Sequence, residues 1–315
     1  MRKALIVGIN DYPTAPLAGC VNDAMAMKNV LERDGDGSPN FQVKLLVEPS
    51  TRVSKAILRK AITDLFRGEA DVALLYFSGH GLLKSSTGYL ITSDYIVHDE
   101  GISMDEILKL AISSKIKDKI IILDCCNSGS FGELGLGVDT NSVLGEGMTI
   151  LTACHNDETS LESNGRGIFT TLIVDALQGG AADIRGNITP GSIYAYVDEA
   201  LGAWDQRPVF KTNVGRFTPI RKIAPKVPLE MLRNLTTYFD TPEADHKLSP
   251  KYEDSEADHD PEKVKIFKEL QKFVAVGLVL PVGEEHMYYA AMNSTSCKLT
   301  AMGYQYWRLV KEGKI

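Results

Sequence analysis

The stretch KIIILDCCNSGSFG, residues 119–132, contains the pattern that decides the fold. Its first half is an apolar run without polar alternation, which is typical of a strand covered on both faces of a parallel sheet. The run ends in two adjacent cysteines, and the Asn-Ser-Gly that follows predicts a turn toward solvent. Cys125 and Cys126 could form a metal pair or a redox pair, or one of them could be a nucleophile beside an inert neighbour.

Four further apolar runs predict strands of the same sheet. They are ALIVGI (4–9), QVKLLVE (42–48), VALLYFS (72–78) and MTILTAC (148–154). Segments with apolar residues at helical spacing occur between and after these runs, at 57–66, 105–112 and 169–177. This alternation predicts an α/β fold, a mostly parallel sheet with helices on both faces. The segment YLITSDYI (89–96) is expected to form a small hairpin beside the sheet.

The composition changes toward the C-terminus and divides the chain. We expect a first domain at 1–222, a connector with an acidic linker at 223–261, and a small α+β module at 262–315. Residues 240–262 carry nine acids and two lysines, and the difference equals the formal net charge of the whole chain, −7. So polar a segment is not expected to pack as core.

The C-terminal pattern is similar to a winged helix. Helices are expected at 229–239 and 262–276, and a hairpin at 277–292 turns at Gly283. A last helical face is formed by Leu299, Met302, Tyr306 and Leu309. Residues 263–315 carry eight basic side chains against four glutamates, an excess too small to indicate nucleic-acid binding.

Composition excludes several classes of protein. No apolar run approaches the roughly 18 residues of a membrane span, and ALIVGI is too short for a signal peptide. Five cysteines without framework spacing favour a reduced, cytoplasmic protein. None of them has the spacing of a zinc site or a thioredoxin motif.

His80 has the setting of a functional residue. It stands in YFSGHG (76–81), at the carboxyl end of a buried strand and between two glycines. Glycine lets the backbone turn sharply and a ligand approach closely. In open α/β sheets, sites gather at the carboxyl ends of strands. A merely solvated or core histidine would need neither feature.

The alternation of side chains along a strand distinguishes the two cysteines. Asp124 and Cys126 point to one face, whereas Cys125 points to the other and is expected to pack under a helix as a small apolar residue. The His80 strand precedes the Cys126 strand with one helix between them, so a right-handed crossover makes them neighbours. We therefore predict that Cys126 is a nucleophile that the imidazole of His80 activates.

These residues carry a family resemblance. YFSGHG followed by ILDCCNSG resembles the His and Cys motifs of caspase-like cysteine peptidases, closest to the metacaspase and bacterial branch. The separation of 46 residues between His80 and Cys126 is similar to the family's spacing of roughly 50. The segments 4–24 and 167–177 resemble the family's first strand with its loop and a later helix, so the resemblance covers about residues 1–220.

The resemblance implies roles for further residues. His80 and Cys126 match the general base and the nucleophile. The backbone N–H groups of Gly81 and Cys126 match the oxyanion hole. The acidic floor of the S1 pocket, which receives the side chain before the cut bond, is matched by Asp124 and Asp23, with Ser78 beside it. An acidic floor implies cleavage after arginine or lysine.

The calcium cluster of metacaspases is only partly matched, by Asp94, Asp99 and Glu100. We expect these three to be solvated loop acids, so neither a metal nor another cofactor is predicted.

The sequence thus predicts a cytoplasmic cysteine endopeptidase that cleaves protein substrates after Arg or Lys. The family resemblance implies a regulated effector of bacterial stress or phage defence, which an upstream protease or sensor protein triggers through the C-terminal module. One alternative is an aspartate-specific peptidase, which would need basic residues in place of Asp23 and Asp124. The other is a sensor or transcription regulator with a DNA-binding winged helix, which the intact pair of His80 and Cys126 disfavours. Nucleic acids and membranes are not expected partners.

Overall fold

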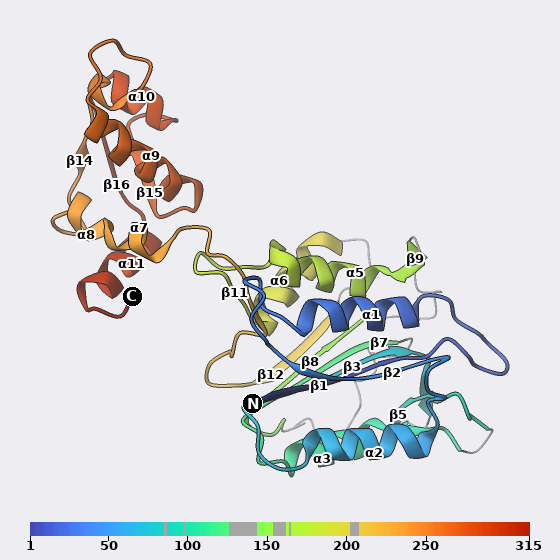
Figure 1. The fold of residues 1–315 in the computed structure, drawn as a ribbon. Helices are drawn as coiled ribbons and strands as arrows, with labels where there is room; N and C mark the ends of the chain where they lie inside the picture. Colours follow the sequence, from blue (N-terminus) through green and yellow to red (C-terminus); the bar gives the residue numbers. More distant parts are fainter. Residues whose placement is uncertain (85–86, 97–98, 126–143, 154–161, 164, 202–207) are drawn as a thin grey trace. The chain divides into compact units, whose positions relative to one another are not determined.

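The computed structural model describes residues 1–84, 87–96, 99–125, 144–153, 162–163, 165–201 and 208–315. The chain divides into two compact units (Figure 1). Unit 1 consists of Met1–Ala182 and Asn187–Ile223, and unit 2 of Asp183–Gly186 and Ala224–Ile315. Each unit has a buried apolar core of its own.

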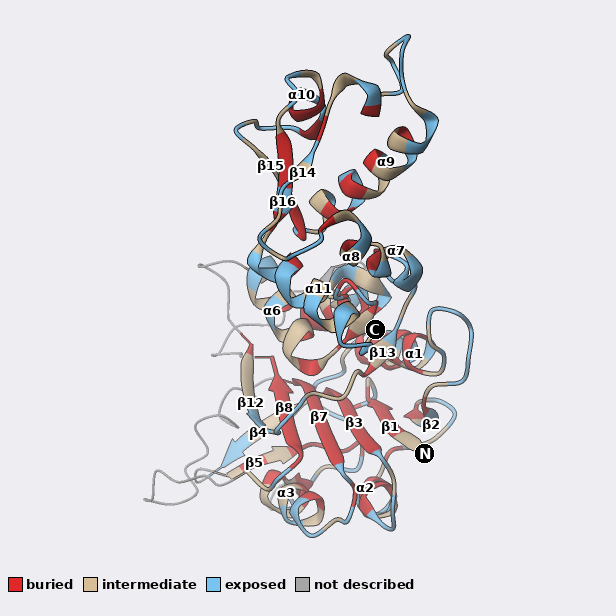
Figure 2. Cartoon of the chain, turned by 90° about the vertical axis from the view of Figure 1, so that its left-hand side faces the viewer, coloured by how far each residue is buried: buried red, intermediate tan, exposed pale blue. Residues whose placement is uncertain are grey.

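Unit 1 is built on a sheet that has six strands in the described ranges, in the order β12-β8-β7-β3-β1-β2. The strands are β1 (Arg2–Gly8), β2 (Gln42–Val47), β3 (Val72–Gly79), β7 (Asp118–Cys125), β8 (Met148–Thr152) and β12 (Val209–Asn213). All neighbours are parallel except β12, which runs antiparallel to β8. The five strands predicted from apolar runs are confirmed, and β1, β3, β7 and β8 are buried along most of their length (Figure 2). Strand β12 was not predicted, because its half-buried and exposed residues form no apolar run.

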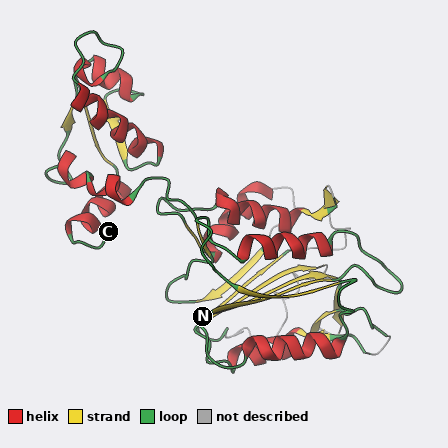
Figure 3. Ribbon diagram, viewed as in Figure 1, coloured by secondary structure: helices red, strands yellow, loops and turns green. Residues whose placement is uncertain are grey.

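Helices cover both faces of the sheet, as predicted; Figure 3 shows the strands between two helical layers. One layer contains α1 (Cys20–Leu31), α5 (Ile168–Asp175) with the π-helical turn η1 (Ala176–Gly180), and α6 (Pro190–Leu201). The other contains α2 (Lys55–Phe66) and α3 (Met104–Ile112). Both helices of this second layer begin at a serine, Ser54 or Ser103, whose side chain accepts a hydrogen bond from the first turn.

A small antiparallel sheet follows β3. It consists of β4 (Gly81–Lys84), β5 (Thr87–Leu90) and β6 (Ile102–Ser103), with β5 in the middle. The hairpin predicted at 89–96 therefore lies earlier in the sequence, because β5 pairs with the strand before it, β4. After Leu90 the chain leaves the strand and turns, and the N–H of Tyr95 donates to the carbonyl of Thr92. Two shorter pairs, β9 (Glu162–Ser163) with β10 (Arg166–Gly167) and β11 (Asn187–Ile188) with β13 (Arg221–Lys222), complete unit 1.

Unit 2 has a three-stranded antiparallel sheet, β14-β16-β15, and several helices. Its elements are α7 (Leu229–Arg233), α8 (Leu235–Tyr238), β14 (His246–Lys247), the 3-10 turn η2 (Pro250–Tyr252), α9 (Pro261–Ala275), β15 (Val279–Val282), α10 (Met287–Met292), β16 (Ser296–Leu299) and α11 (Ala301–Lys311). The helices expected near 229–239 and 262–276 are present.

The segment expected to be a connector, 223–261, is for the most part an integral piece of unit 2. Leu232, Phe239 and Leu248 are buried in its core. Asp240, Glu243 and Asp245, which lie between Phe239 and Leu248, are exposed, and beyond them Asp254 forms an ion pair with Lys268 at the surface. A strongly acidic composition therefore does not prevent packing, because widely spaced apolar side chains are enough to anchor the segment.

The hairpin expected at 277–292 also differs. Residues 287–292 form α10, because Met287, Ala290 and Ala291 are apolar at helical spacing and pack into the core. Strand β15 pairs instead with β16, which contains Leu299. The predicted last helical face is wrong in part, since Met302 is exposed and Gly303, Tyr306 and Trp307 lie inward. Over the described residues, no helix has the length and apolar character required to cross a membrane.

Candidate active site

The carboxyl ends of β3 and β7 lie side by side. The two strands pair in parallel, with Ser78 opposite Asp124 and Gly79 opposite Cys125. The strand neighbours predicted from the crossover rule are thereby confirmed. His80 is the next residue after Gly79; Cys126, the predicted nucleophile and one of the two predicted oxyanion donors, lies outside the described residues.

One segment, the loop 9–19 between β1 and α1, holds His80 from outside its own strand. Its Nε2 lies 2.7 Å from the carbonyl oxygen of Ala15. A carbonyl only accepts, so this hydrogen bond assigns the ring proton to Nε2 and leaves the lone pair on Nδ1. The backbone N–H of His80 donates to the Tyr12 hydroxyl at 2.9 Å, and the two rings lie 4.5 Å apart between centroids. A neutral imidazole held in this tautomer can take a proton at Nδ1.

The backbone N–H of Gly81 points away from β5. Ile91 donates its N–H to the carbonyl of His80 at 3.0 Å, which makes these two a hydrogen-bonded position of the antiparallel pair. Gly81, opposite Leu90, is then a non-hydrogen-bonded position, whose N–H is directed outward. The register therefore directs the Gly81 N–H away from β5, and nothing in it conflicts with the oxyanion role that the family resemblance implies.

Cys125 and Asp124 occupy opposite faces of β7. Cys125 is 3% exposed and packs in the core on the α2 and α3 side. Asp124 lies on the face that α1 and α5 cover, where Thr170 contacts it. The prediction that Cys125 is a buried apolar residue is confirmed.

The predicted S1 residues converge, with their carboxylates nearly inaccessible to solvent. Asp23, in the first turn of α1, is 2% exposed and Asp124 is 8% exposed. The Ser78 hydroxyl donates to Asp23 Oδ2 at 3.3 Å, and the N–H of Gly167 donates to Asp23 Oδ1 at 3.2 Å. Thr170 donates from Oγ1 to Asp124 Oδ2 at 2.6 Å. Three residues predicted from separate segments thus lie in one cluster.

Burial and the nearby charge of Asp124 change the titration of Asp23. The pKa of Asp23 is raised to about 7, chiefly by burial and next by the negative charge of Asp124. The hydrogen bonds from Gly167 and Ser78 and the positive charge of Arg166 oppose this shift. A cation placed beside the two carboxylates would favour the ionised form of Asp23.

Sequence reasoning missed Tyr12, Ala15, Gly167 and Thr170. Gly167 lies against both carboxylates: a Cβ there would be 2.8 Å from Asp124 Oδ2 and 3.3 Å from Asp23 Oδ2. The only signal in the sequence was their position inside the segments 4–24 and 167–177, which carry the family resemblance without marking these residues.

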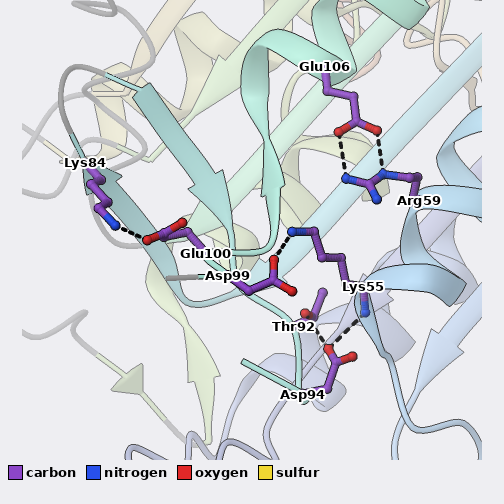
Figure 4. Close-up of polar contacts among 8 residues, drawn as sticks. All are labelled: Lys55, Arg59, Lys84, Thr92, Asp94, Asp99, Glu100 and Glu106. Carbon is purple, nitrogen blue, oxygen red and sulfur yellow. Dashed lines mark hydrogen bonds and ion pairs between the residues drawn. The ribbon is translucent and has the colours of Figure 1, made fainter. Parts of the chain in front are cut away.

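The three acids considered for calcium each contact a lysine, and Asp94 and Asp99 share Lys55, as Figure 4 shows. Asp99 forms an ion pair with Lys55, and Glu100 forms one with Lys84. Asp94 accepts hydrogen bonds from Thr92 and from the backbone N–H of Lys55. Asp94 and Asp99 are exposed, as expected of solvated loop acids, whereas the side chain of Glu100 is 14% exposed. Within the described ranges, no group of three or more candidate metal ligands occurs.

The comparisons with known proteins agree with this geometry. The sequence model of the Peptidase C14 caspase domain matches residues 1–216. The chain belongs to the caspase family. As a caspase-family member it carries a cysteine peptidase domain, and residues 217–315 lie outside the match.

Solved structures similar to this caspase-family chain share its fold. A protein of Geobacter sulfurreducens is 17% identical, with a TM-score of 0.51, and the alignment covers 71% of this chain and 97% of that one. Caspase-1 from Spodoptera frugiperda is 14% identical, with a TM-score of 0.51 and coverage of 70% and 91%. A comparison with curated proteins finds no match.

Proposed function

We propose that the chain is a cysteine endopeptidase in which Cys126 is the nucleophile and His80 the general base and acid. The observation that carries this proposal is the register of β3 and β7. Gly79 lies opposite Cys125, so the next residues along the two strands are His80 and Cys126. The bond from His80 Nε2 to Ala15 supports the role of His80, because it leaves Nδ1 for proton exchange with a thiol.

The chemistry follows from these groups. His80 Nδ1 takes the thiol proton, and the sulfur of Cys126 attacks the carbonyl carbon of the peptide bond. The carbonyl oxygen becomes negative and is stabilised by the N–H groups of Gly81 and Cys126. His80 then protonates the leaving amine, the C–N bond breaks, and a thioester forms. Water deprotonated by His80 hydrolyses the thioester and restores the thiol, so the reaction consumes no cofactor.

The proposed preference is for arginine, then lysine, before the cleaved bond. Asp23 and Asp124 are buried together, and burial and the repulsion between the two acids raise the pKa of Asp23. A guanidinium relieves this repulsion and can give a carboxylate two parallel hydrogen bonds, which lysine cannot do. An aspartate side chain would add a third negative charge, which disfavours the aspartate-specific alternative.

The cellular role proposed here rests on the family resemblance alone. It is that of a regulated effector in bacterial stress or phage defence, acting in the cytoplasm. Unit 2 is then the part that receives a signal from an activating protease or sensor protein. Its separate core supports a separate function.

The test is cleavage of three fluorogenic peptides that differ only in Arg, Lys or Asp before the cut bond. Wild type should cleave the Arg peptide fastest, and Cys126→Ala should cleave none. A DNA-shift assay on the same preparation tests the alternative of a transcription regulator. Specific DNA binding together with no turnover of any peptide would overturn the proposed function.

A further inference from the structure

A tyrosine hydroxyl is inserted into the first rung of the small sheet, beside His80. In a regular antiparallel ladder, a hydrogen-bonded pair exchanges two N–H to carbonyl bonds. Ile91 and His80 form one of them, from the N–H of Ile91 to the carbonyl of His80 at 3.0 Å. In place of the second, the N–H of His80 donates to the Tyr12 hydroxyl at 2.9 Å, and that hydroxyl donates to the carbonyl of Ile91 at 3.3 Å.

This insertion fixes where the His80 peptide lies. An oxygen between the two backbone groups keeps the N–H of His80 from closing directly onto the carbonyl of Ile91. The Tyr12 ring, 4% exposed, is fixed by the core around it and lies against the imidazole with centroids 4.5 Å apart. Gly79 leaves the space for the hydroxyl, since a Cβ at that position would be 2.5 Å from it.

We propose that Tyr12 is a positioning residue for catalysis, which sets both the orientation of the His80 imidazole and the direction of the Gly81 N–H. This inference rests on the proposed peptidase function of His80 and Cys126. The Tyr12 hydroxyl acts through the backbone: the peptide whose N–H it accepts precedes His80, and the next peptide carries the N–H of Gly81. One contact therefore positions the base and an oxyanion donor together.

The environment of Tyr12 keeps its hydroxyl neutral, which it must be to accept one hydrogen bond and donate another. Burial raises the pKa of the phenol well above its ordinary value. The titratable groups that act on it from neighbouring elements are Cys20 on α1, Cys125 on β7 and Glu48 after β2, and each raises this pKa further. A neutral phenol accepts from His80 and donates to Ile91 at the same time.

The main test is Tyr12→Phe, which keeps the ring and removes only the hydroxyl. We expect kcat on the Arg peptide to fall about tenfold with KM nearly unchanged, because misplaced catalytic groups slow the chemical step. The matched control is Tyr252→Phe, another buried tyrosine whose hydroxyl contacts a histidine, His246 at 3.0 Å, in unit 2. It should keep the wild-type kcat.

A second measurement does not depend on turnover. In protein with Cys126→Ala, the ring nitrogens of His80 are followed by nitrogen-15 NMR across pH, and His80→Gln assigns the signal. We expect the Nε2-protonated tautomer with Tyr12, and a weaker tautomer preference with a shifted titration midpoint in Tyr12→Phe. If Tyr12→Phe does not fold, 3,5-difluorotyrosine at position 12 keeps the hydroxyl as a weaker acceptor and should shift the signal in the same direction.

The outcomes separate the two proposals. A wild-type protein that cleaves no peptide contradicts the peptidase function and with it the catalytic part of the Tyr12 proposal, and the NMR comparison then tests only whether Tyr12 orients the His80 ring. Wild-type kcat in Tyr12→Phe, or a His80 signal that neither substitution changes, overturns the positioning role. A loss of thermal stability with kcat unchanged below the unfolding temperature shows a purely structural tyrosine and overturns it as well.

Discussion

Ser78 lies directly opposite Asp124 in the register of β3 and β7, and its hydroxyl points to a second acid, Asp23 on α1, at 3.3 Å. These two contacts connect the carboxyl ends of two central strands to helix α1. The acidic cluster therefore lies at the ends of β3 and β7, the two strands that lead to His80 and Cys126. Substrate recognition and bond cleavage can therefore be tested separately.

The two cysteines should differ sharply on substitution. Cys126→Ala should abolish peptidase activity because it removes the nucleophile. Cys125→Ala should keep most of kcat and lower the free energy of unfolding by about 1 kcal/mol or more, because it leaves a small cavity in the core. Peptide turnover and urea unfolding of both variants measure this. Equal losses of turnover in two equally well-folded variants would contradict the assignment.

Asp124→Ala should strongly slow cleavage after arginine and leave the reactivity of the Cys126 thiol unchanged. The Asp124 carboxylate accepts a hydrogen bond from Thr170, on the face of β7 toward α1. We expect kcat/KM on the Arg peptide to fall by about 100-fold, as for the loss of a buried charge partner. Iodoacetamide should still alkylate Cys126 at close to the wild-type rate.

The control for this substitution is Asp94→Ala, which removes an exposed acid that accepts hydrogen bonds from Thr92 and from the backbone N–H of Lys55. It should leave kcat/KM on the Arg peptide unchanged. Fast cleavage of an Asp peptide by the unmodified protein, with none after Arg or Lys, would refute the acidic S1 pocket.

Stability should fall as pH rises toward neutrality, because of Asp23. Its pKa is raised to about 7 in the folded protein, above the ordinary value of an unfolded aspartate near 4. The folded state therefore binds more protons between these values, so this contribution is complete below pH 4 and is lost as pH rises through about 7.

Asp23→Asn should remove that contribution and flatten the dependence of unfolding free energy on pH between about 4 and 7. Urea unfolding at a series of pH values measures it, with Asp94→Asn as an exposed control. Addition of benzamidine, an arginine-like cation, should raise the unfolding temperature of wild type more at pH 8 than at pH 5. An unchanged slope in Asp23→Asn would show that Asp23 titrates normally.

Self-cleavage should avoid the segment after the nucleophile. Residues 127–147 contain neither lysine nor arginine, so an enzyme specific for basic residues has no site there. Arg166, exposed near the β9–β10 turn, and Lys226 are better sites than Arg221, whose guanidinium donates to two backbone carbonyls. Mass spectrometry of incubated protein locates the cuts. An obligatory cut within 127–147 would contradict the proposed specificity.

Deletion of 226–315 should change regulation more than bond cleavage. The proposed catalytic and S1 residues all precede position 130, and unit 2 has its own core. We expect kcat on small peptides to stay within about threefold of wild type. The deletion exposes Ile184, which belongs to the core of unit 2, so Ile184→Ser should be included to limit aggregation. A folded fragment without any turnover would show that unit 2 completes the active site.

The sequence by itself determined the features that repeat along the chain. Apolar runs without polar alternation gave the parallel strands, and the two-residue period of a strand separated Cys125 from Asp124. The crossover rule then placed the strand of His80 beside that of Cys126. These inferences succeeded because each depends on local periodicity or on a general rule of topology.

The tertiary structure alone decided which distant groups complete the site. Tyr12 contacts His80 across 68 residues of sequence, and Gly167 contacts Asp23 across 144. In unit 2, Phe239 and Leu248 enter a core although three acids lie between them in the sequence, and α10 interrupts the expected hairpin. Such contacts depend on how loops and helices pack onto the sheet, and packing is settled by the shape and burial of many side chains at once. No local pattern of residues predicts this packing.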